Sequence, residues 1–401
     1  MANDLNQTPS ANRVHIGFFG LRNAGKSSLV NAVTGQALSI VSDVKGTTTD
    51  PVQKAMELLP LGPVVILDTP GLDDEGELGA LRVRRAYQAL NKTDVAVLVV
   101  DGTLGLQAED RAILERIRAK EIPYLVVYNK GDLKSHPVTE DWEMAVSAKD
   151  GSGVHELKER IAVLAKQQGP EKKILGDLIA PGDLVVLVTP IDGSAPKGRM
   201  ILPQVQTIRD VMDAHAACIV TQPEELPGQL SGLKTPPKLV VTDSQAFGTV
   251  KNMVPETIPL TSFSILFARY KGILATAVRG AARLRQLRDG DRVLISEGCT
   301  HHRQCNDIGT VKLPGWLENF SGKKPDFSFT SGTEFPEDLS PFSLVVHCGG
   351  CMLNEREMVY RMKNAEDQNI PFTNYGTAIA HMNGILKRSL EVFPDLAAEL
   401  E

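Results

Sequence analysis

A phosphate-binding loop near the start of the chain constrains the fold more than any other feature. Residues 20–27 read GLRNAGKS, which matches the pattern G-x-x-x-x-G-K-[ST]. An apolar run, Val14–Phe19, precedes this loop, and a run of helical character, 28–33, follows it. In this strand–loop–helix order, backbone N–H groups wrap the phosphates and the helix N-terminus favours negative charge. The expected fold class is therefore α/β, beginning with a P-loop nucleotide-binding domain.

Further motifs follow the loop in the order that is typical of GTP-binding domains. Residues 46–49 (GTTT) lie where a switch loop would place a threonine on the metal, and residues 68–71 (DTPG) follow a buried strand. Residues 129–132 (NKGD) and 147–149 (SAK) complete the series. The carboxylate of Asp132 can accept two hydrogen bonds from the N1–H and the exocyclic amine of guanine, which adenine cannot supply. The expected ligands are therefore GTP and GDP rather than ATP.

These motifs predict the residues of a nucleotide site. The residues expected to bind the nucleotide are Gly20, Asn23, Ala24, Gly25, Lys26, Ser27, Ser28, Thr48, Asp68, Gly71, Asn129, Lys130, Asp132, Ser147, Ala148 and Lys149. The residues expected to act in hydrolysis are Lys26, Thr48, Gly71 and Asn23. We expect Ser27 and Thr48 to bind Mg²⁺. Leu72 stands where Ras-like proteins carry the glutamine that orients the attacking water, so intrinsic hydrolysis should be slow.

Residues 13 to 168 resemble the translation-factor-related GTPases, and within them the branch of the tRNA-modification GTPases and the Era and Der families. The resemblance rests on the motifs above. Asn23 matches the P-loop asparagine that helps potassium-activated members of this branch to hold K⁺ in place of an arginine finger. We therefore expect K⁺ to accelerate hydrolysis. The alternative is that Asn23 merely closes the loop.

The length and composition indicate a soluble chain of about three domains. The chain has 401 residues, a net charge of -6 and 42% hydrophobic residues. No apolar run is long enough to span a bilayer, and the polar N-terminus does not resemble a signal peptide. We expect a cytoplasmic protein that binds neither nucleic acid nor membrane. A polar break at 167–173 predicts the first domain boundary.

The middle of the chain predicts a second small parallel sheet. Runs of strand length occur at 184–188, 217–220 and 239–241, with an amphipathic helix at 205–215 between two of them. Cys218, inside the second run, is expected to be buried as a small apolar residue. This part shows no catalytic residues, which makes it a candidate for self-association. A single long helix is expected over 262–288.

Two groups of potential metal ligands follow strand-like runs in the last third of the chain. Residues 347–351 read HCGGC after the apolar run 342–346, and residues 299–302 read CTHH after 292–296. Both groups thus lie where a strand ends, and in α/β sheets ligands collect at the carboxyl ends of neighbouring strands. Five cysteines without an export signal point to metal or redox chemistry rather than disulfides. Spacing alone leaves zinc, a [4Fe-4S] cluster and a reactive dithiol open.

The combination of an N-terminal GTPase with CTHH and a later HCGGC resembles the HydF family of [FeFe]-hydrogenase maturation GTPases over nearly the full length. The resemblance implies three domains: a P-loop GTPase domain (1–170), a dimerisation domain (171–262) and an iron–sulfur cluster-binding domain (263–401). It also implies a homodimeric scaffold. This scaffold receives a two-iron precursor from radical-SAM maturases and delivers it to apo-[FeFe]-hydrogenase.

The same resemblance implies the ligands of a [4Fe-4S] cluster. Cys299, Cys348 and Cys351 would bind three irons, and His301 or His347 would be candidates for the labile fourth position. Cys305 has no place in the family pattern and is a further candidate, as is an exogenous ligand. The nucleotide state could bias domain positions or partner affinity through the switch loops.

Two other functions stay open at this point. One is a ribosome- or tRNA-associated regulatory GTPase with a structural zinc domain, which the lack of a basic surplus in the C-terminal half disfavours. The other is a redox-sensing GTPase whose cysteines form a regulatory disulfide. Metal content and salt-dependent RNA binding would separate the three.

Overall fold

The computed structural model describes residues 8–36, 52–71, 76–166, 172–191, 200–299, 307–332 and 334–397. The chain forms two compact units, residues 1–170 and 171–401.

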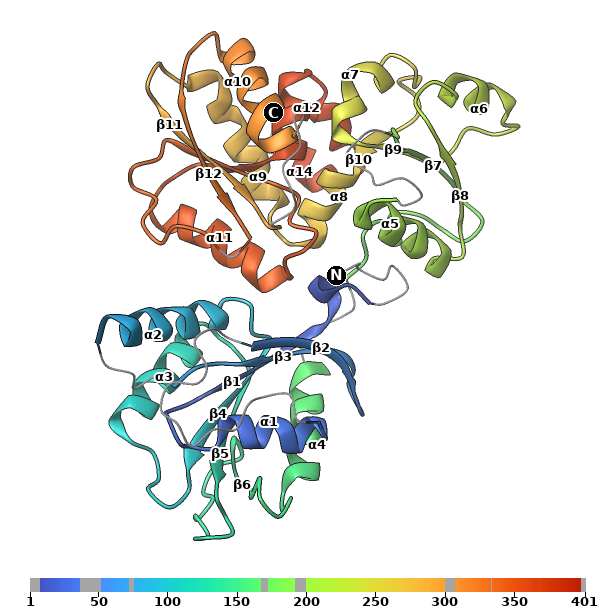
Figure 1. Cartoon of the computed structure of the whole chain (residues 1–401). Coiled ribbons are helices and arrows are strands. Elements are labelled where there is room, and N and C mark those ends of the chain that lie inside the picture. The colour runs from blue at the N-terminus through green and yellow to red at the C-terminus, as the bar shows by residue number, and fades with distance from the viewer. Residues whose placement is uncertain are drawn as a thin grey trace. The chain divides into compact units, whose positions relative to one another are not determined.

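The first unit is a six-stranded sheet with helices on both faces (Figure 1). Its strands are β1 (Val14–Phe19), β2 (Val52–Leu58), β3 (Gly62–Asp68), β4 (Val95–Asp101), β5 (Tyr124–Asn129) and β6 (Glu143–Ala145). Its α-helices are α1 (Lys26–Thr34), α2 (Gly76–Leu90), α3 (Ala108–Ala119) and α4 (Val154–Lys166), and a 3₁₀-helix, Ser10–Asn12, precedes β1. The strand order is β2-β3-β1-β4-β5-β6, in which β2 alone pairs antiparallel with its neighbour.

Alternation along the central strands builds two hydrophobic cores, one on each face of this sheet. In β4, Val97 and Val99 face the core formed with α1 and α4, whereas Leu98 and Val100 face the core formed with α2 and α3. Successive side chains of a strand point to opposite faces, so an unbroken apolar run is what a strand covered on both sides requires. Burying a side chain of this size contributes about 1.5–3 kcal/mol. The strand predicted at 14–19 is confirmed as β1, and the buried strand predicted before residues 68–71 is confirmed as β3.

The second unit contains two four-stranded parallel sheets. The first, with order β10-β9-β7-β8, contains β7 (Leu184–Val188), β8 (Ala217–Thr221), β9 (Leu239–Thr242) and β10 (Leu260–Ser262). The second, with order β12-β11-β13-β14, contains β11 (Arg292–Glu297), β12 (Asp326–Ser331), β13 (Leu344–His347) and β14 (Phe372–Asn374). The parallel sheet predicted for the middle of the chain is therefore confirmed.

Helices connect and cover these two sheets (Figure 1). The α-helices are α5 (Leu202–Asp213), α6 (Leu226–Gly232), α7 (Phe247–Val250), α8 (Phe263–Tyr270), α9 (Leu274–Ala281), α10 (Leu313–Ser321), α11 (Glu355–Asp367), α12 (Tyr375–Met382), α13 (Leu386–Ser389) and α14 (Pro394–Ala397). Two 3₁₀-helices, Ser244–Ala246 and Ala282–Gln286, and a π-helical turn, Ile308–Lys312, complete the unit. One hydrophobic core extends from Val186 in β7 through Phe267 in α8 to Val345 in β13. The two sheets share this core, which does not divide at residue 262. The boundary between the dimerisation and cluster-binding domains near that residue therefore stays a prediction.

Two expectations about the second unit are wrong. The single helix expected over 262–288 is broken into α8, α9 and the 3₁₀-helix Ala282–Gln286. Gly272 separates α8 from α9 with φ +71°, a left-handed conformation that ends a helix. Cys218 is only half-buried, because β8 is an edge strand of its sheet.

Candidate functional site

The phosphate-binding loop connects β1 to α1, and two of its glycines leave no room for a side chain. A Cβ atom on Gly20 would lie 2.1 Å from the carbonyl oxygen of Val99, and one on Gly25 would lie 2.2 Å from Nδ2 of Asn129. Gly25 has φ +88° and caps the N-terminus of α1. The Asn129 amide donates a hydrogen bond of 3.0 Å to the carbonyl oxygen of Ala24. The NKGD motif thus supports the phosphate-binding loop through this hydrogen bond.

Two charged or polar side chains of the loop are placed for phosphate and metal chemistry. Nζ of the buried Lys26 donates hydrogen bonds to the carbonyl oxygens of Gly20 (3.0 Å) and Leu21 (2.6 Å). The Ser27 hydroxyl donates to Oδ2 of Asp68 at 2.9 Å. A hydroxyl and a carboxylate side by side are the oxygen ligands that Mg²⁺ prefers, so this pair fits a Mg²⁺ ion.

The base-recognition residues meet at the ends of β5 and β6. Oδ1 of Asp132 accepts a 3.1 Å hydrogen bond from the Ser147 hydroxyl, and Lys149 forms a 3.5 Å ion pair with the same carboxylate. The backbone N–H of Ala148 donates to Oδ1 of Asn129 at 3.0 Å. The structure therefore brings the NKGD and SAK motifs together. Gly71 lies just after β3, whereas Thr48 and Leu72 lie outside the described residues.

Sequence reasoning missed the role of Asp101, the last residue of β4. Its carboxylate forms a 2.6 Å ion pair with Nζ of Lys130 in the NKGD motif. Burial opposes ionisation of Asp101, but hydrogen bonds from Lys130 and Thr103 outweigh burial and lower the pKa of Asp101. Asp101 pairs with Asn129 in the register of β4 and β5. The position of this aspartate at the carboxyl end of a strand was the sequence signal that could have indicated its role.

The two cysteine-containing segments lie side by side at the carboxyl ends of neighbouring strands, as predicted. In the parallel pair β11–β13, Ser296 is in register with His347. The backbone N–H of Cys348 donates to the carbonyl oxygen of Ser296 at 2.9 Å. The segment that carries Cys299 therefore begins next to the segment that carries Cys348 and Cys351.

The Cys348 thiol has the surroundings of a metal-binding sulfur. Its Sγ accepts hydrogen bonds from the backbone N–H groups of Gly298 (3.1 Å) and Gly350 (3.4 Å). Gly350 has φ +63°, and a Cβ atom there would lie 2.4 Å from the sulfur of Met358. The loop thus requires glycine at this position to turn closely around the thiol.

The Cys348 thiol lies close enough to the Cys351 and Cys299 thiols for both to affect its ionisation. Burial, with the adjacent Cys351 and Cys299 thiols, raises the pKa of Cys348 to about 12. Burial also raises the pKa of Cys351, although the Lys271 ammonium opposes that rise. Thiols placed near one another are donors of the kind that metal clusters use. Within the part of the chain that the structure describes, no three His, Cys, Asp or Glu side chains already have metal-binding geometry. His301 and Cys305 lie outside that part.

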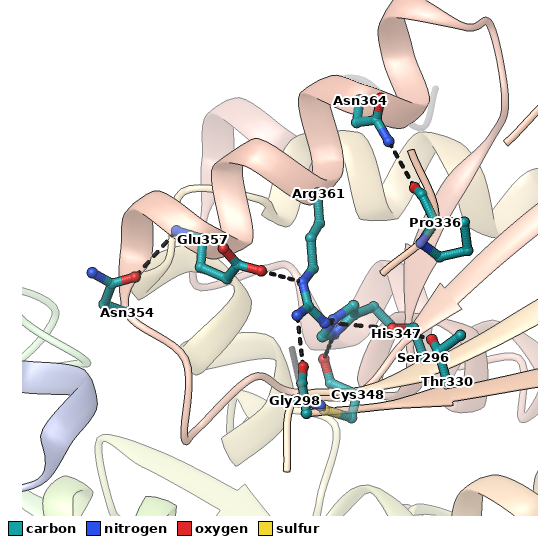
Figure 2. Close-up of polar contacts among 11 residues, drawn as sticks. Ser296, Gly298, Thr330, Pro336, His347, Cys348, Asn354, Glu357, Arg361 and Asn364 are labelled. Carbon is teal, nitrogen blue, oxygen red and sulfur yellow. Dashed lines mark hydrogen bonds and ion pairs between the residues drawn. The ribbon is translucent and has the colours of Figure 1, made fainter. Parts of the chain in front are cut away.

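His347 takes part in a buried network rather than facing the thiols. Its Nδ1 lies 2.8 Å from the carbonyl oxygen of Cys348, and its Nε2 lies 3.0 Å from a terminal nitrogen of Arg361 (Figure 2). Burial and the positive charge of Arg361 lower the pKa of His347 to about 3. Both ring nitrogens are thus engaged in this arrangement. Sequence reasoning missed Arg361 and its partner Glu357, both on α11.

Family models match three consecutive parts of the chain. Residues 15–130 match the 50S ribosome-binding GTPase model, and residues 174–272 match the hydrogen maturase F dimerization domain. Residues 275–392 match the hydrogen maturase F tetramerization domain. The chain belongs to the hydrogen maturase F (HydF) family. It carries the GTPase domain of that family and is a GTPase, and the two other matches indicate self-association.

Curated GTPases of other families match part of this chain. The tRNA modification GTPase MnmE of Nitrosomonas eutropha is 35% identical over 164 residues, which are 39% of this chain and 35% of the relative. The GTPase Der of Kosmotoga olearia is 29% identical over 184 residues, 41% of either protein. The matches thus span well under half of these relatives.

Two solved structures match part of this chain. The Era structure of Aquifex aeolicus bound to GDP and AlF4⁻ is 20% identical, covers 52% of this chain and 93% of Era, and has a TM-score of 0.35. The G domain of the T. maritima FeoB iron transporter is 22% identical, covers 38% of this chain and 99% of that domain, and has a TM-score of 0.29. Separately, none of the helices among the described residues has the length and apolar character needed to cross a bilayer.

Proposed function

We propose that this chain is a GTP-hydrolysing carrier that binds a [4Fe-4S] cluster through Cys299, Cys348 and Cys351. Its cargo would be the two-iron precursor of the hydrogenase active site, received from radical-SAM maturases and delivered to apo-[FeFe]-hydrogenase. The observation that carries the proposal is the meeting of the β11 and β13 ends, which places these thiols near one another. Membership of the HydF family supports the identity of the client.

The surroundings of the thiols suit a cluster that must hold a second group and release it. Thiolates bind iron–sulfur clusters, and N–H groups directed at sulfur stabilise the charged form. Three cysteines satisfy three of four irons, so a bound [4Fe-4S] cluster would supply one iron with an exchangeable position for cargo. A closed shell of four cysteines would be a poor carrier. We place this activity in the cytoplasm, where GTP is available.

The delivery role is tested by transfer of cargo. The chain is coexpressed with the radical-SAM maturases, purified without oxygen and mixed with apo-[FeFe]-hydrogenase, and hydrogen evolution is measured. We expect activation that depends on the added chain and differs between its GTP-bound and GDP-bound forms. Equal activation by a preparation made without the maturases would contradict delivery. Equal rates of hydrogenase activation with GTP and with GDP would contradict the coupling to the nucleotide state but not the delivery itself.

A ribosome- or tRNA-associated GTPase with a structural zinc site is the alternative function. The GTPase-domain model and the MnmE relatives favour it. The two hydrogen maturase F matches, at 174–272 and 275–392, favour the carrier.

We also propose that Mg²⁺ and K⁺ assist hydrolysis, with Asn23 as a K⁺ ligand. Asn23 is exposed on the loop and has φ +62°, a left-handed conformation that asparagine tolerates. A cation held beside the transferring phosphate stabilises its developing charge. We expect GTP hydrolysis to be roughly tenfold or more faster in KCl than in NaCl, since one such contact is worth about 10²–10³ in rate.

The variant Asn23→Gly separates the two roles considered for Asn23. Glycine keeps the left-handed turn but lacks the carboxamide. If the side chain binds K⁺, Asn23→Gly loses the difference between KCl and NaCl while it still binds GTP. Full K⁺ stimulation in this variant would show that position 23 only closes the loop.

The homodimer expected from the family would form through the edge strand β8. Val220 on this strand is 42% exposed, and Cys218 and Ile219 are half-buried. An edge strand with apolar side chains is a surface that pairs with another copy. Val220→Lys should weaken self-association by roughly tenfold or more, because burying a valine contributes about 1.5–3 kcal/mol. Sedimentation equilibrium measures this, with the exposed Val163→Lys on α4 as the control. Unchanged association in Val220→Lys would exclude β8.

A further inference from the structure

Arg361 is a fully buried charged residue next to the cysteine segment. It lies on α11, and its side chain points toward the carboxyl ends of β11 and β13 (Figure 2). Nε donates to Oε1 of Glu357 at 2.9 Å, and one terminal nitrogen donates to the carbonyl oxygen of Gly332 at 2.7 Å. The other terminal nitrogen lies 3.0 Å from Nε2 of His347 and 3.5 Å from the Ser296 hydroxyl. Burial of a charge this deep requires such partners.

The Arg361 contact fixes the protonation pattern of His347. An arginine guanidinium carries donors and no acceptor, so Nε2 of His347 must accept the hydrogen bond. The ring proton then resides on Nδ1, which donates to the carbonyl oxygen of Cys348 at 2.8 Å. Hydrogen bonds therefore run from Arg361 through His347 to the backbone of a proposed cluster ligand.

Packing holds the His347 ring in the same place. Its centroid lies 6.0 Å from the ring of Phe372 and 6.5 Å from the ring of Phe335. Arg361 in turn lies over the Phe335 ring at 5.1 Å. His347 is the last residue of β13 and has no exposed surface. Turning the ring toward the thiols would break both of its hydrogen bonds and leave the buried guanidinium without one partner.

We propose that Arg361 is a positioning residue, which holds His347 as a support for the Cys348 segment and keeps it from serving as the fourth ligand. The fourth iron would then depend on His301, Cys305 or an exogenous group. The identity of the bound group rests on the proposed function, but the support of Cys348 by Arg361 and His347 is a property of the metal-free chain. The proposed function and the role of Arg361 can therefore be refuted independently of each other.

The first test uses the metal-free full-length chain labelled with ¹⁵N-histidine. NMR of the ring nitrogens distinguishes the two neutral tautomers, and the His347 signals are assigned by their loss in His347→Gln. We expect a proton on Nδ1 and an unprotonated Nε2. A proton on Nε2 would overturn the proposal, whether or not the chain binds iron.

The second test uses the same labelled protein after anaerobic reconstitution with iron and sulfide. Pulsed EPR of the reduced protein detects ¹⁵N bound directly to iron. We expect His347→Gln to leave this ¹⁵N spectrum unchanged. Loss of a direct ¹⁵N coupling in His347→Gln protein that still shows the reduced-cluster EPR signal would overturn the proposal. Failure of the wild type to take up iron would contradict the proposed function, and the tautomer measurement would still decide the role of Arg361.

The third test changes the positioning residue itself. Arg361→Met/Glu357→Gln removes both charges of the buried pair, so no unpaired charge is left inside. We expect mixed tautomers of His347 and at least a severalfold loss of iron retained per chain. Arg361→Lys, with Glu357 kept, should retain more iron than this double variant. Arg388→Met is the matched control, because Arg388 donates to the carbonyl oxygens of Lys251 (3.2 Å) and Val254 (2.9 Å), in the same unit. A double variant that keeps the wild-type tautomer and iron content would overturn the proposal.

Discussion

Replacing Cys348 with alanine is expected to remove most of the iron that the chain retains after anaerobic reconstitution. The Cys348 sulfur is half-buried and accepts hydrogen bonds from two backbone N–H groups, at 3.1 and 3.4 Å. Loss of even an outer-shell partner typically costs about 10–100-fold in metal affinity, so loss of a direct ligand should cost at least as much. Iron and sulfide per chain, measured after desalting, give the result.

Cys218→Ala is the control for this experiment. Cys218 is a half-buried cysteine in the same unit, on the edge strand β8, and it should be dispensable for iron. Thermal unfolding of both metal-free variants shows whether they fold as the wild type does. Wild-type iron content in a folded Cys348→Ala variant would show that the cluster is bound elsewhere.

Replacing Asp132 with alanine is expected to weaken the binding of both GTP and GDP by roughly 10²–10⁴-fold. The Ser147 hydroxyl and Lys149 hold this carboxylate at the ends of β5 and β6. Each hydrogen bond from guanine to a charged acceptor contributes about 1.5–3 kcal/mol, and the variant loses two. Titration with a fluorescent guanine nucleotide measures the affinity.

Asp141→Ala is the matched control, because Asp141 is an exposed aspartate of the same unit. It should bind guanine nucleotides as the wild type does. ATP binding should be weak in all three proteins. Unchanged GTP affinity in Asp132→Ala would show that a different group reads the base.

The nucleotide unit could be predicted closely because its motifs are local. The loop at 20–27 lies between a strand and a helix that adjoin it in sequence, and its glycines meet Val99 and Asn129 as such a loop requires. The side-by-side placement of Cys299 and Cys348 could be predicted for a similar reason. Each follows an apolar run, and parallel strands of one sheet bring their carboxyl ends to the same edge.

Features that depend on packing between distant segments could not be predicted. The exposure of Cys218 depends on which strand occupies the sheet edge, and composition does not reveal that order. The break at Gly272 competes with a helical pattern that continues on both sides. Arg361 looks like one of many charges on an amphipathic helix until α11 packs over β13 and buries it beside His347.

Metal content of the wild-type chain tests the central claim most directly. The full-length protein is purified without oxygen, offered iron and sulfide in one sample and zinc in another, desalted and analysed for metals and by EPR after reduction. The carrier account predicts about four irons and four sulfides per chain, with the signal of a reduced [4Fe-4S] cluster. One tightly bound zinc per chain, with no uptake of iron, would contradict it and would make the cysteine site structural.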